Sequence, residues 1–329
     1  MKQFGHCACA VASIVEQSER NSNSKPRPAV RIPLLEAMHE NKYPLVSDPR
    51  DPRFLLLRSL QTPQGRSRTG QYLIEGIRHV AQAVEHYAPI DFVFLDPSRL
   101  SNRFGQKLVE RLRRSGIPGV RLSPQLYRQL TLAAEPQGVG AVVHQRWTRL
   151  ADVRVARDSF WLGIESVDSP GNLGTIMRTA EATGVAGILI VGGDADPWDP
   201  AAVRASMGSL FSQKLVPCSV REFADWARRD RVTVIGSSPK GLLDYRALPR
   251  RWPVALLVGN ERRGLSGHLG AVCDFTVRIP MQGDCDSINV AVATGVLLFE
   301  ILKQRKEAQQ RAGNELARPD QSPRPAVAR

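Results

Sequence analysis

The sequence predicts an α/β protein, with a buried parallel sheet covered by helices on both faces and a smaller α/β domain before it. Two observations lead to this prediction. Short apolar runs alternate with segments whose apolar residues recur at helical spacing. In the C-terminal half these runs are nearly continuous, as in strands that are covered on both faces. The composition agrees, because 42% of the 329 residues are hydrophobic and 23% are charged, as in ordinary globular proteins.

Five segments are expected along the chain. Residues 1–48 are polar and aperiodic, so we expect a disordered or poorly ordered extension that need not belong to the native protein. A small α/β domain follows at 49–147, a linker at 148–158 and the larger α/β domain at 159–305. The basic end of the chain, 306–329, is again expected to be disordered.

The pattern of the first domain predicts four helices and four strands. The helices are expected at 53–61, 77–87, 101–116 and 123–133, and the strands at 71–76, 91–96, 119–123 and 138–145. The stretch QTPQGRSRTG (61–70) is rich in Gly, Ser and Thr and is expected to be a loop.

The larger domain alternates strands and helices more regularly. Strands are expected at 160–165, 187–191, 214–217, 231–237, 253–259 and 275–280, and helices at 172–184, 201–211, 220–230 and from 287 onward. Arg178 is expected near the start of its helix, where the positive end of the helix dipole disfavours a cation. A surface salt bridge would explain that position, and so would a site for an anion.

The charge bears on partners. The formal net charge is +13, and between Arg50 and Arg149 sixteen Lys or Arg face seven Asp or Glu, a local net charge of +9. Such an excess favours RNA as a partner. The candidate RNA-binding residues are Arg66, Arg68, Arg111, Arg113 and Arg114. For any single one of these arginines, a solvated helix face is the favoured interpretation, and RNA contact is favoured only for the excess over the whole domain.

Cysteine usage and hydropathy limit the other options. The five cysteines are scattered without zinc-like spacing, so we expect a reducing compartment, no disulfide framework and no metal. The apolar run 7–15 only weakly resembles a signal peptide, and no stretch reaches the roughly 18 residues that a membrane span requires. We therefore expect a cytoplasmic protein without a membrane partner.

Three polar segments follow strands of the larger domain, at the sheet edge where parallel α/β proteins bind ligands. They are DSPGNLGTIMRTAEATGV (168–185), LLVGNERRGLS (256–266) and IPMQGDCDSINVAVATGVLLFEIL (279–302). The dinucleotide fingerprint G-x-G-x-x-G, the P-loop and the G-x-S-x-G elbow are all absent from the chain. An ordinary Rossmann dehydrogenase or P-loop enzyme is therefore disfavoured.

In this order and spacing, the three segments resemble the motifs of the SpoU/TrmH family of RNA ribose 2′-O-methyltransferases. The matching residues are Asn172, Gly174, Arg178 and Thr179 in the first motif, Gly259, Asn260, Glu261, Gly264 and Leu265 in the second, and Ile279, Pro280, Met281, Gly283, Ser287, Ile288, Asn289 and Val290 in the third. The first domain, with YLIEG at 72–76 and PQGVGAVV at 136–143, is more loosely similar to the ribosomal-protein-like substrate domain that precedes many SpoU domains.

The resemblance implies a deep trefoil knot, a homodimer with the apolar last helix in its interface, and S-adenosylmethionine as the methyl donor. The implied cofactor-binding residues are Leu257, Val258, Gly259, Asn260, Gly264, Ile279, Met281, Ser287, Ile288 and Asn289. The implied catalytic residues are Arg178, Asn172, Glu261, Ser287 and Asn289. Within this set, Arg178 either activates the 2′-hydroxyl as a base or clamps phosphate and developing alkoxide; a guanidinium favours the second role, since it donates hydrogen bonds and accepts none.

Simpler interpretations remain for single residues, because Asn172 and Ser287 are good helix N-caps and Glu261 would suit a solvated turn. The expected substrate is structured RNA, with 23S-type rRNA favoured over tRNA. Other readings are a catalytically silent RNA-binding protein of ribosome assembly and an unrelated small-molecule α/β enzyme. The sequence identifies neither the modified nucleotide nor whether the modification is housekeeping or confers antibiotic resistance.

Overall fold

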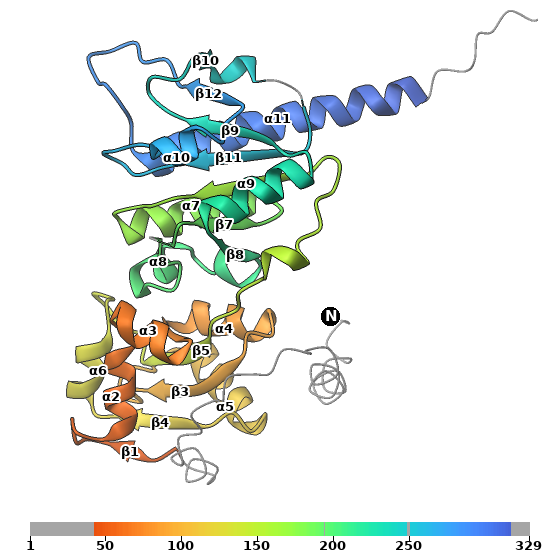
Figure 1. Cartoon of the computed structure of the whole chain (residues 1–329). Coiled ribbons are helices and arrows are strands. Elements are labelled where there is room, and N and C mark those ends of the chain that lie inside the picture. The colour runs from red at the N-terminus through yellow and green to blue at the C-terminus, as the bar shows by residue number, and fades with distance from the viewer. Residues whose placement is uncertain (1–42, 194, 249–250, 317–329) are drawn as a thin grey trace, which may run out of the picture. The chain divides into compact units, whose positions relative to one another are not determined.

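The computed structural model describes residues 43–193, 195–248 and 251–316, and these contain two sheets, each with its own helices (Figure 1). The expected extension before residue 43 and the end of the chain after 316 lie outside the described residues. The two sheets correspond to the two α/β domains that the alternating pattern predicts.

The first sheet has five strands in the order β1-β4-β3-β5-β2. Its strands are β1 (Leu45–Val46), β2 (Gln71–Glu75), β3 (Ile90–Leu95), β4 (Gly119–Leu122) and β5 (Val139–His144). The β1, β4 and β3 strands run parallel to one another, whereas β5 is antiparallel to both β3 and β2. The helices of this domain are α2 (Pro52–Ser59), α3 (Pro63–Thr69), α4 (Ile77–Glu85), α5 (Arg103–Arg114) and α6 (Pro124–Leu130).

Two expectations for this domain are wrong. Residues 43–48 belong to the domain and not to an extension, because β1 pairs with β4, Val46 is buried and the Tyr43 hydroxyl donates to the Ile117 carbonyl oxygen at 2.9 Å. The stretch 61–70 contains α3 where a loop was expected. Thr62 caps that helix by accepting from Gly65 N–H, and Pro63 occupies its first turn, where proline needs no hydrogen-bond donor.

The second sheet has seven strands in the order β10-β12-β9-β11-β6-β7-β8. Its strands are β6 (Phe160–Ile164), β7 (Ile188–Val191), β8 (Leu215–Cys218), β9 (Thr233–Ser237), β10 (Leu243–Asp244), β11 (Val254–Val258) and β12 (Phe275–Arg278). Every pairing in it is parallel, which confirms the predicted sheet type. Every residue of the two central strands, β6 and β11, is buried, as their continuous apolar runs indicate.

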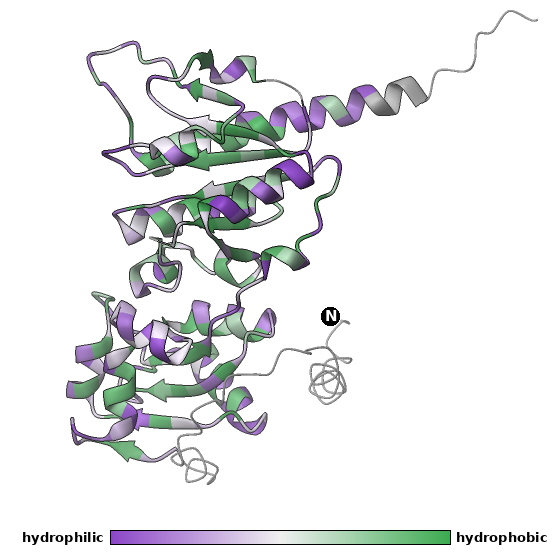
Figure 2. Cartoon of the chain, in the orientation of Figure 1, coloured by the Kyte–Doolittle hydropathy of each residue, from purple (hydrophilic) through white to green (hydrophobic). Residues whose placement is uncertain are grey.

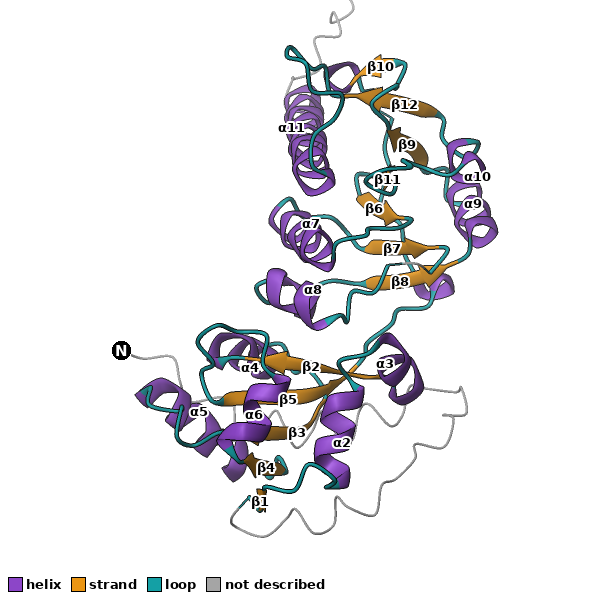
Figure 3. Ribbon diagram, turned by 90° about the vertical axis from the view of Figure 1, so that its left-hand side faces the viewer, coloured by secondary structure: helices purple, strands orange, loops and turns teal. Residues whose placement is uncertain are grey.

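Helices cover both faces of this sheet. On one face lie α7 (Pro170–Ala182), α8 (Pro200–Ala205) and α11 (Val290–Leu316), and on the other lie α9 (Val220–Arg229) and the short α10 (Gly267–Gly270) (Figure 3). Short 3₁₀ helices occur at Leu150–Asp152, Ser209–Phe211 and Tyr245–Ala247. In Figure 2 the hydrophobic colour concentrates on the strands, whereas α9 and the outer part of α11 are mainly hydrophilic.

Two helices differ from the expectation. The predicted helix 201–211 stops at Ala205 and resumes as a 3₁₀ turn at Ser209, because Met207 and Gly208 both have positive φ angles. The last helix continues to Leu316, so residues 306–316 are helical and do not belong to a disordered tail. Its outer part is tied to the start of the domain, because Asp158 accepts hydrogen bonds from Arg305 at 3.3 Å and from Gln309 at 2.7 Å.

Candidate active site

The first motif lies at the start of α7, directly after β6. Ser169 caps this helix, and its side chain accepts from the Asn172 N–H at 3.4 Å, so Asn172 is not the cap and its amide is free for other contacts. Gly174 brings α7 close to α8, since a Cβ at this position would lie 2.3 Å from the Ala202 carbonyl oxygen. Gly174 is therefore required for the close packing of α7 on α8, and Asn172, in the first turn of α7, has a side-chain amide that is free to contact other motifs.

The second motif forms a compact loop after β11. Asn260 and Gly264 exchange two backbone hydrogen bonds of 3.0 and 2.9 Å, and Gly264 has a φ of +67°, which glycine adopts at little cost. A Cβ on Gly259 would lie 2.3 Å from the Gly264 carbonyl oxygen, so only glycine fits the first position without movement. This loop is closed by its own backbone.

Asn260 anchors that loop to the end of β6. Its buried side-chain amide donates to Asp168 at 2.6 Å and to Ser166 at 3.1 Å, and its side-chain oxygen accepts from the Arg262 and Arg263 N–H groups at 3.0 and 3.2 Å. Four hydrogen bonds from one buried side chain fix the loop against the neighbouring strand end.

The third motif is the segment between β12 and α11. Residues 282–289 are exposed, and Asn289 begins the helix, with its side-chain oxygen accepting from the Ala291 and Val292 N–H groups at 2.8 and 3.3 Å. Asn289 is therefore the N-cap, and the interpretation of Ser287 as the cap is wrong. Ser287 is exposed and has no hydrogen bond to another described residue.

Glu261 and two asparagines join the three motifs into one cluster. The Glu261 carboxylate accepts from the Asp168 N–H at 2.8 Å and from the Asn172 side-chain amide at 3.0 Å. Asn172 in turn accepts from the Asn289 amide at 3.1 Å. One chain of hydrogen bonds thus runs from the second motif through the first to the third.

The cluster also sets the protonation of Glu261. Partial burial works to raise the pKa of Glu261, but hydrogen bonds from the Asp168 N–H and the Asn172 amide outweigh it, so this pKa lies below its usual value. At neutral pH the side chain is a carboxylate, which accepts hydrogen bonds and donates none. Glu261 thereby orients the Asn172 amide, which leaves the Asn172 oxygen to accept from Asn289.

Arg178 lies apart from this cluster. The helix begins at Pro170, so Arg178 is in its third turn and not near its start, about 9 Å along the axis from Asn172. Its side chain is exposed and makes no hydrogen bond or ion pair to another described residue. The question of a cation at the helix start therefore does not arise, and neither Arg178 nor Ser287 joins the hydrogen-bonded cluster.

The residues implied for the cofactor lie on both sides of the same edge. Leu257, Val258, Gly259 and Asn260 are buried at the end of β11, whereas Ile279 and Met281 are partly exposed just after β12. Ile288, next to the start of α11, is 37% exposed. This edge therefore presents partly exposed apolar side chains beside the polar groups of the motif loops, which suits a ligand that is partly apolar and partly polar.

Of the five arginines expected to bind RNA, Arg66 requires a correction. Its side chain is only 2% exposed, and its guanidinium donates to Asp196 at 2.6 and 2.9 Å, to Asp199 at 3.2 Å and to the Leu60 carbonyl at 3.0 Å. It is therefore a buried contact between the two domains and is not available to RNA. Arg68, Arg111, Arg113 and Arg114 are exposed, although Arg113 and Arg114 both pair with Glu110.

Three residues near the site were missed by the sequence reasoning. Asp168 and Ser166 bind Asn260, and Glu165 accepts from the Ser266 N–H at 2.9 Å. The available signal was their position, because all three lie in the polar stretch that follows the first strand of the larger domain. Only the fold indicates that they hold the second motif in place.

Two further observations describe the chain around the site. None of the described helices is long and apolar enough to cross a bilayer. Within the described ranges, no three His, Cys, Asp or Glu side chains gather in the way a metal ion requires.

Both domains of the chain are similar to known proteins. The family model described as SpoU rRNA Methylase family matches residues 159–299, and that of an MRM3-like substrate binding domain matches 52–141. A 23S rRNA (uridine(2479)-2′-O)-methyltransferase of Streptomyces viridochromogenes is 35% identical over 73% of this chain and 85% of its own length. The 23S rRNA (guanosine(2553)-2′-O)-methyltransferase RlmP of Bacillus subtilis is 29% identical over 74% of this chain and 93% of its own.

Solved structures give the same result. The SpoU methyltransferase AviRb from Streptomyces viridochromogenes, in complex with AdoMet, matches with a TM-score of 0.72 and 33% identity, over 78% of this chain and 99% of that one. An AdoMet-bound rRNA methyltransferase from Sinorhizobium meliloti matches with a TM-score of 0.71 and 31% identity, over 79% and 97% of the two chains.

Proposed function

Because the chain belongs to the SpoU rRNA methylase family, we propose that it transfers a methyl group from S-adenosylmethionine to a ribose 2′-hydroxyl of structured RNA, with 23S-type rRNA as the favoured substrate. The observation that carries this proposal is the chain Glu261–Asn172–Asn289, which joins three distant motifs at one sheet edge. Similarity in sequence alone would not require those three side chains to meet.

The methyl donor is S-adenosylmethionine, which supplies an electrophilic methyl group. Backbone groups of the second-motif loop and of Ile279–Met281 would hold it, with apolar contact from Leu257 and Ile288. Two features of the chain support this fit. The absence of a Cβ at Gly259 permits the close packing against Gly264 that shapes the second-motif loop, and Ile288 exposes an apolar side chain in the third motif.

Arg178 is proposed to act on the RNA side of the reaction. It is exposed and unpaired among the described residues, which suits a group that waits for an anionic partner. A guanidinium carries five donors and no acceptor, so we assign it to binding a phosphate and stabilising negative charge that develops on the 2′-oxygen. Acceptance of the 2′-hydroxyl proton by a neutral arginine is the alternative, and it would be detected as a steep rise of rate with pH.

Asn172 and Asn289 would orient the ribose or the donor through their amides, while Glu261 keeps both in position. Positioning of the two reactants supplies a large part of the reduction in the activation barrier in such transfers. The third-motif loop is proposed to thread beneath the second to form a trefoil knot, one of the rare exceptions to unknotted folds. Ser287 is proposed to contact the donor, since it is exposed and its side chain makes no hydrogen bond to another described residue.

A second copy of the chain is proposed to pack on α11. Val292 and Phe299 lie seven residues apart, hence on one side of the helix, and each is 55% exposed. A homodimer would cover this apolar stripe. Phe299→Glu should convert the protein to a monomer in light scattering coupled to size exclusion, whereas Arg58→Glu, at an exposed position of the first domain, should not.

RNA contact is proposed for the exposed basic side chains of the first domain, with Arg68 and the α5 residues Arg111, Arg113 and Arg114 as the main candidates. Their contribution should be electrostatic and should weaken steeply with salt. We also propose a cytoplasmic location, which an rRNA substrate supports.

The test is methyl transfer from labelled S-adenosylmethionine to naked 23S rRNA and to tRNA, followed by mapping of positions that resist alkaline cleavage. We expect a protected ribose in 23S rRNA. Arg178→Ala should bind the donor normally and lose transfer, whereas Arg58→Ala, another exposed arginine, should retain it. A methylated position in tRNA would identify tRNA as the substrate instead. RNA binding without any methyl transfer would favour a catalytically silent protein of ribosome assembly.

A further inference from the structure

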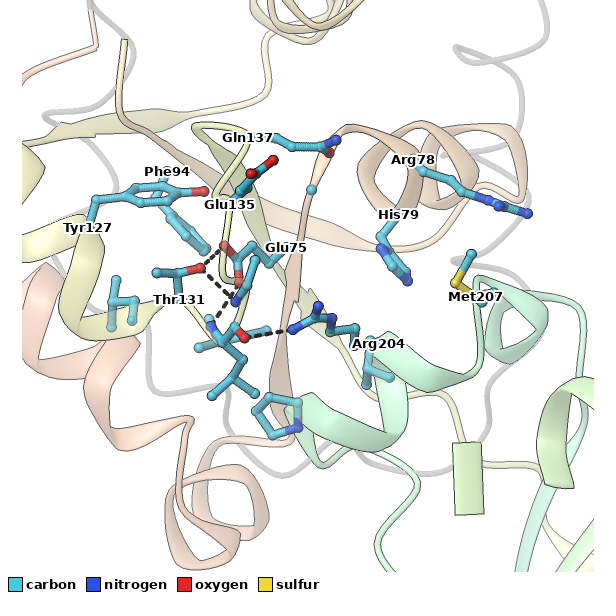
Figure 4. A pocket seen from close by; sticks show the side chains of 17 residues that line it. Glu75, Arg78, His79, Phe94, Tyr127, Thr131, Glu135, Gln137, Arg204 and Met207 are labelled. Atoms are coloured by element: carbon cyan, nitrogen blue, oxygen red, sulfur yellow. Dashed lines mark hydrogen bonds between the residues drawn. The ribbon is translucent and has the colours of Figure 1, made fainter. Parts of the chain in front are cut away.

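A pocket of about 270 Å³ lies between the first domain and α8, away from the three motifs (Figure 4). One side is formed by the end of β2, the start of α4, α6 and the loop that follows it, and the other side by Pro200, Val203, Arg204 and Met207. The proposed methyl transfer uses none of these residues.

One buried polar atom in the pocket lining lacks a hydrogen-bond partner. Tyr127 is fully buried, and its hydroxyl makes no hydrogen bond to a described residue. Buried polar groups are normally paired, because an unpaired one loses its hydration without compensation. The Tyr127 hydroxyl therefore indicates a ligand that brings a hydrogen-bonding group.

His79 brings a hydrogen-bonding group without a charge. Burial lowers the pKa of His79 below its usual value; hydrogen bonds to the Arg204 and Glu75 backbone oppose this shift, and the charges of Arg78 and Arg204 add to it. At neutral pH the imidazole is uncharged and can act as donor or acceptor at Nε2, depending on its tautomer. As a donor it can bind a phosphate oxygen.

Cations lie on the lining as well. Arg78 is exposed and has no ion pair or hydrogen bond within the described ranges, and Figure 4 shows it at the opposite end of the lining from Tyr127. Arg204 donates through one Nη atom to the Leu132 carbonyl at 2.6 Å, which leaves its other donors available. Tyr127 thus lies at one end of the pocket, and His79 lies with Arg78 at the other end (Figure 4).

The loop 131–137 that closes one side is held by the protein itself. The Glu75 carboxylate accepts from the Thr131 hydroxyl and from the Leu132 N–H, so its charge is largely satisfied. Leu132 is 50% exposed and adds an apolar surface to the lining. Apolar walls, convergent polar groups and cations at one end together suit a flat base that is joined to a phosphate.

We propose that this pocket binds one unpaired nucleotide of the substrate RNA, with its base toward Tyr127 and its phosphate toward Arg78 and the neighbouring His79. The inference rests on the proposed function for the identity of the RNA. RNA is favoured over a free nucleotide because the pocket opens on a domain with a net charge of +9, which holds a polyanion better than a small anion. Residues of both domains line the site, so one bound nucleotide would contact both.

The test uses the full chain and two variants that act differently. Arg78→Ala removes charge, and Ala133→Trp fills the pocket without changing charge, since the Ala133 side chain is a single methyl group on its lining. Arg58→Ala is the matched control, because it removes an exposed arginine of the same domain that does not line the pocket. Thermal unfolding by circular dichroism establishes that each variant is folded.

Binding of naked 23S rRNA is measured by filter retention across a range of salt. Both pocket variants should raise the Kd about tenfold, and Arg78→Ala alone should reduce the salt slope by about one. In methyl transfer, KM should rise while kcat stays within about twofold, because donor and ribose are bound elsewhere. Equal losses in Arg58→Ala, or unchanged binding in both pocket variants, would overturn the proposal.

Photo-crosslinking of 4-thiouridine-substituted 23S rRNA supplies an independent readout. Crosslinks should fall on peptides containing Tyr127 or Met207 and should persist in excess UMP or AMP. Displacement by micromolar mononucleotide would instead identify a free nucleotide as the ligand and overturn the RNA assignment. If the wild-type protein methylates no RNA yet the Arg78-dependent binding persists, only the proposed function fails; if it methylates RNA and the pocket variants behave as wild type, only the pocket proposal fails.

Discussion

The second-motif loop follows β11 and the third-motif loop follows β12 of the same sheet, but the two loops are held very differently. The second-motif loop is closed by two backbone hydrogen bonds and anchored by the buried Asn260. The third-motif loop is exposed from 282 to 289, and its side-chain link to the other motifs runs through Asn289. The second-motif loop is thus formed before any ligand binds, and we infer that the third-motif loop takes its final form around the methyl donor.

The largest expected effect comes from breaking the preformed loop. Asn260→Ala removes four hydrogen bonds and leaves Asp168 without its 2.6 Å partner, so the free energy of unfolding should fall by about 3 kcal/mol. Binding of S-adenosylmethionine, measured by calorimetry, should be lost together with transfer. Urea titration gives the stability change.

Arg262→Ala is the control for this experiment, because the Arg262 side chain is exposed and only its backbone contacts Asn260. It should change the free energy of unfolding by less than about 0.5 kcal/mol. Equal destabilisation by Asn260→Ala and Arg262→Ala would mean that the loop is sensitive to any substitution. It would contradict the claim that the Asn260 side chain anchors the loop.

A smaller effect is expected from Glu261→Gln, which keeps the shape of the side chain and removes its charge. A glutamine amide can replace only part of the carboxylate's acceptor capacity, so Asn172 should lose its fixed orientation, and transfer should fall about 100-fold through misplacement. The donor affinity should change little, since the second-motif loop is held by Asn260.

The same residue predicts a pH dependence. Because the pKa of Glu261 is lower in the folded protein than in the unfolded chain, its stabilisation is complete above the unfolded pKa and is lost as pH falls through the folded pKa. Urea titrations over the acidic range should therefore show a steeper loss of stability in wild type than in Glu261→Gln. Parallel curves for the two proteins would refute the charged cluster.

A contrast between the loops should also appear in hydrogen exchange. Addition of S-adenosylmethionine should slow amide exchange in 282–289 by a larger factor than in 259–266, because the second-motif loop is already protected by its own bonds. Mass spectrometry of peptides from both loops measures this directly. Similar protection of both would mean that the two loops are equally formed before binding.

The sequence predicts the sheet and the meeting of the motifs for a general reason. The strands are continuous apolar runs, and the carboxyl ends of parallel strands share one edge, so the loops after β6, β11 and β12 had to lie close together. What it does not predict depends on distant partners. The burial of Arg66 depends on Asp196 and Asp199, some 130 residues away, and β1 exists only because β4 accepts it.

Local signals also misled in identifiable ways. The stretch with α3 was read from its Gly and Ser content, although its Thr-Pro start is a helix signal. Asn172 and Ser287 each fit the profile of an N-cap, but the caps are Ser169 and Asn289. A capping residue is identified only when the helix start is known to within one position, which periodicity does not provide.

The smallest expected effect distinguishes Asn289 from Ser287, the two residues of the third motif that could cap α11. Asn289→Ala should lower the free energy of unfolding by about 1 kcal/mol, because the α11 N–H groups of Ala291 and Val292 lose their acceptor. Ser287→Ala should leave stability within about 0.5 kcal/mol of wild type, since Ser287 is exposed and its side chain makes no hydrogen bond to another described residue. The effect of Ser287→Ala should appear only when ligand is bound. The affinity for S-adenosylmethionine should become about two- to tenfold weaker, which is the effect of losing one hydrogen bond. A destabilised Ser287→Ala would instead mean that the third-motif loop is already formed without ligand, and the difference between the two loops would disappear.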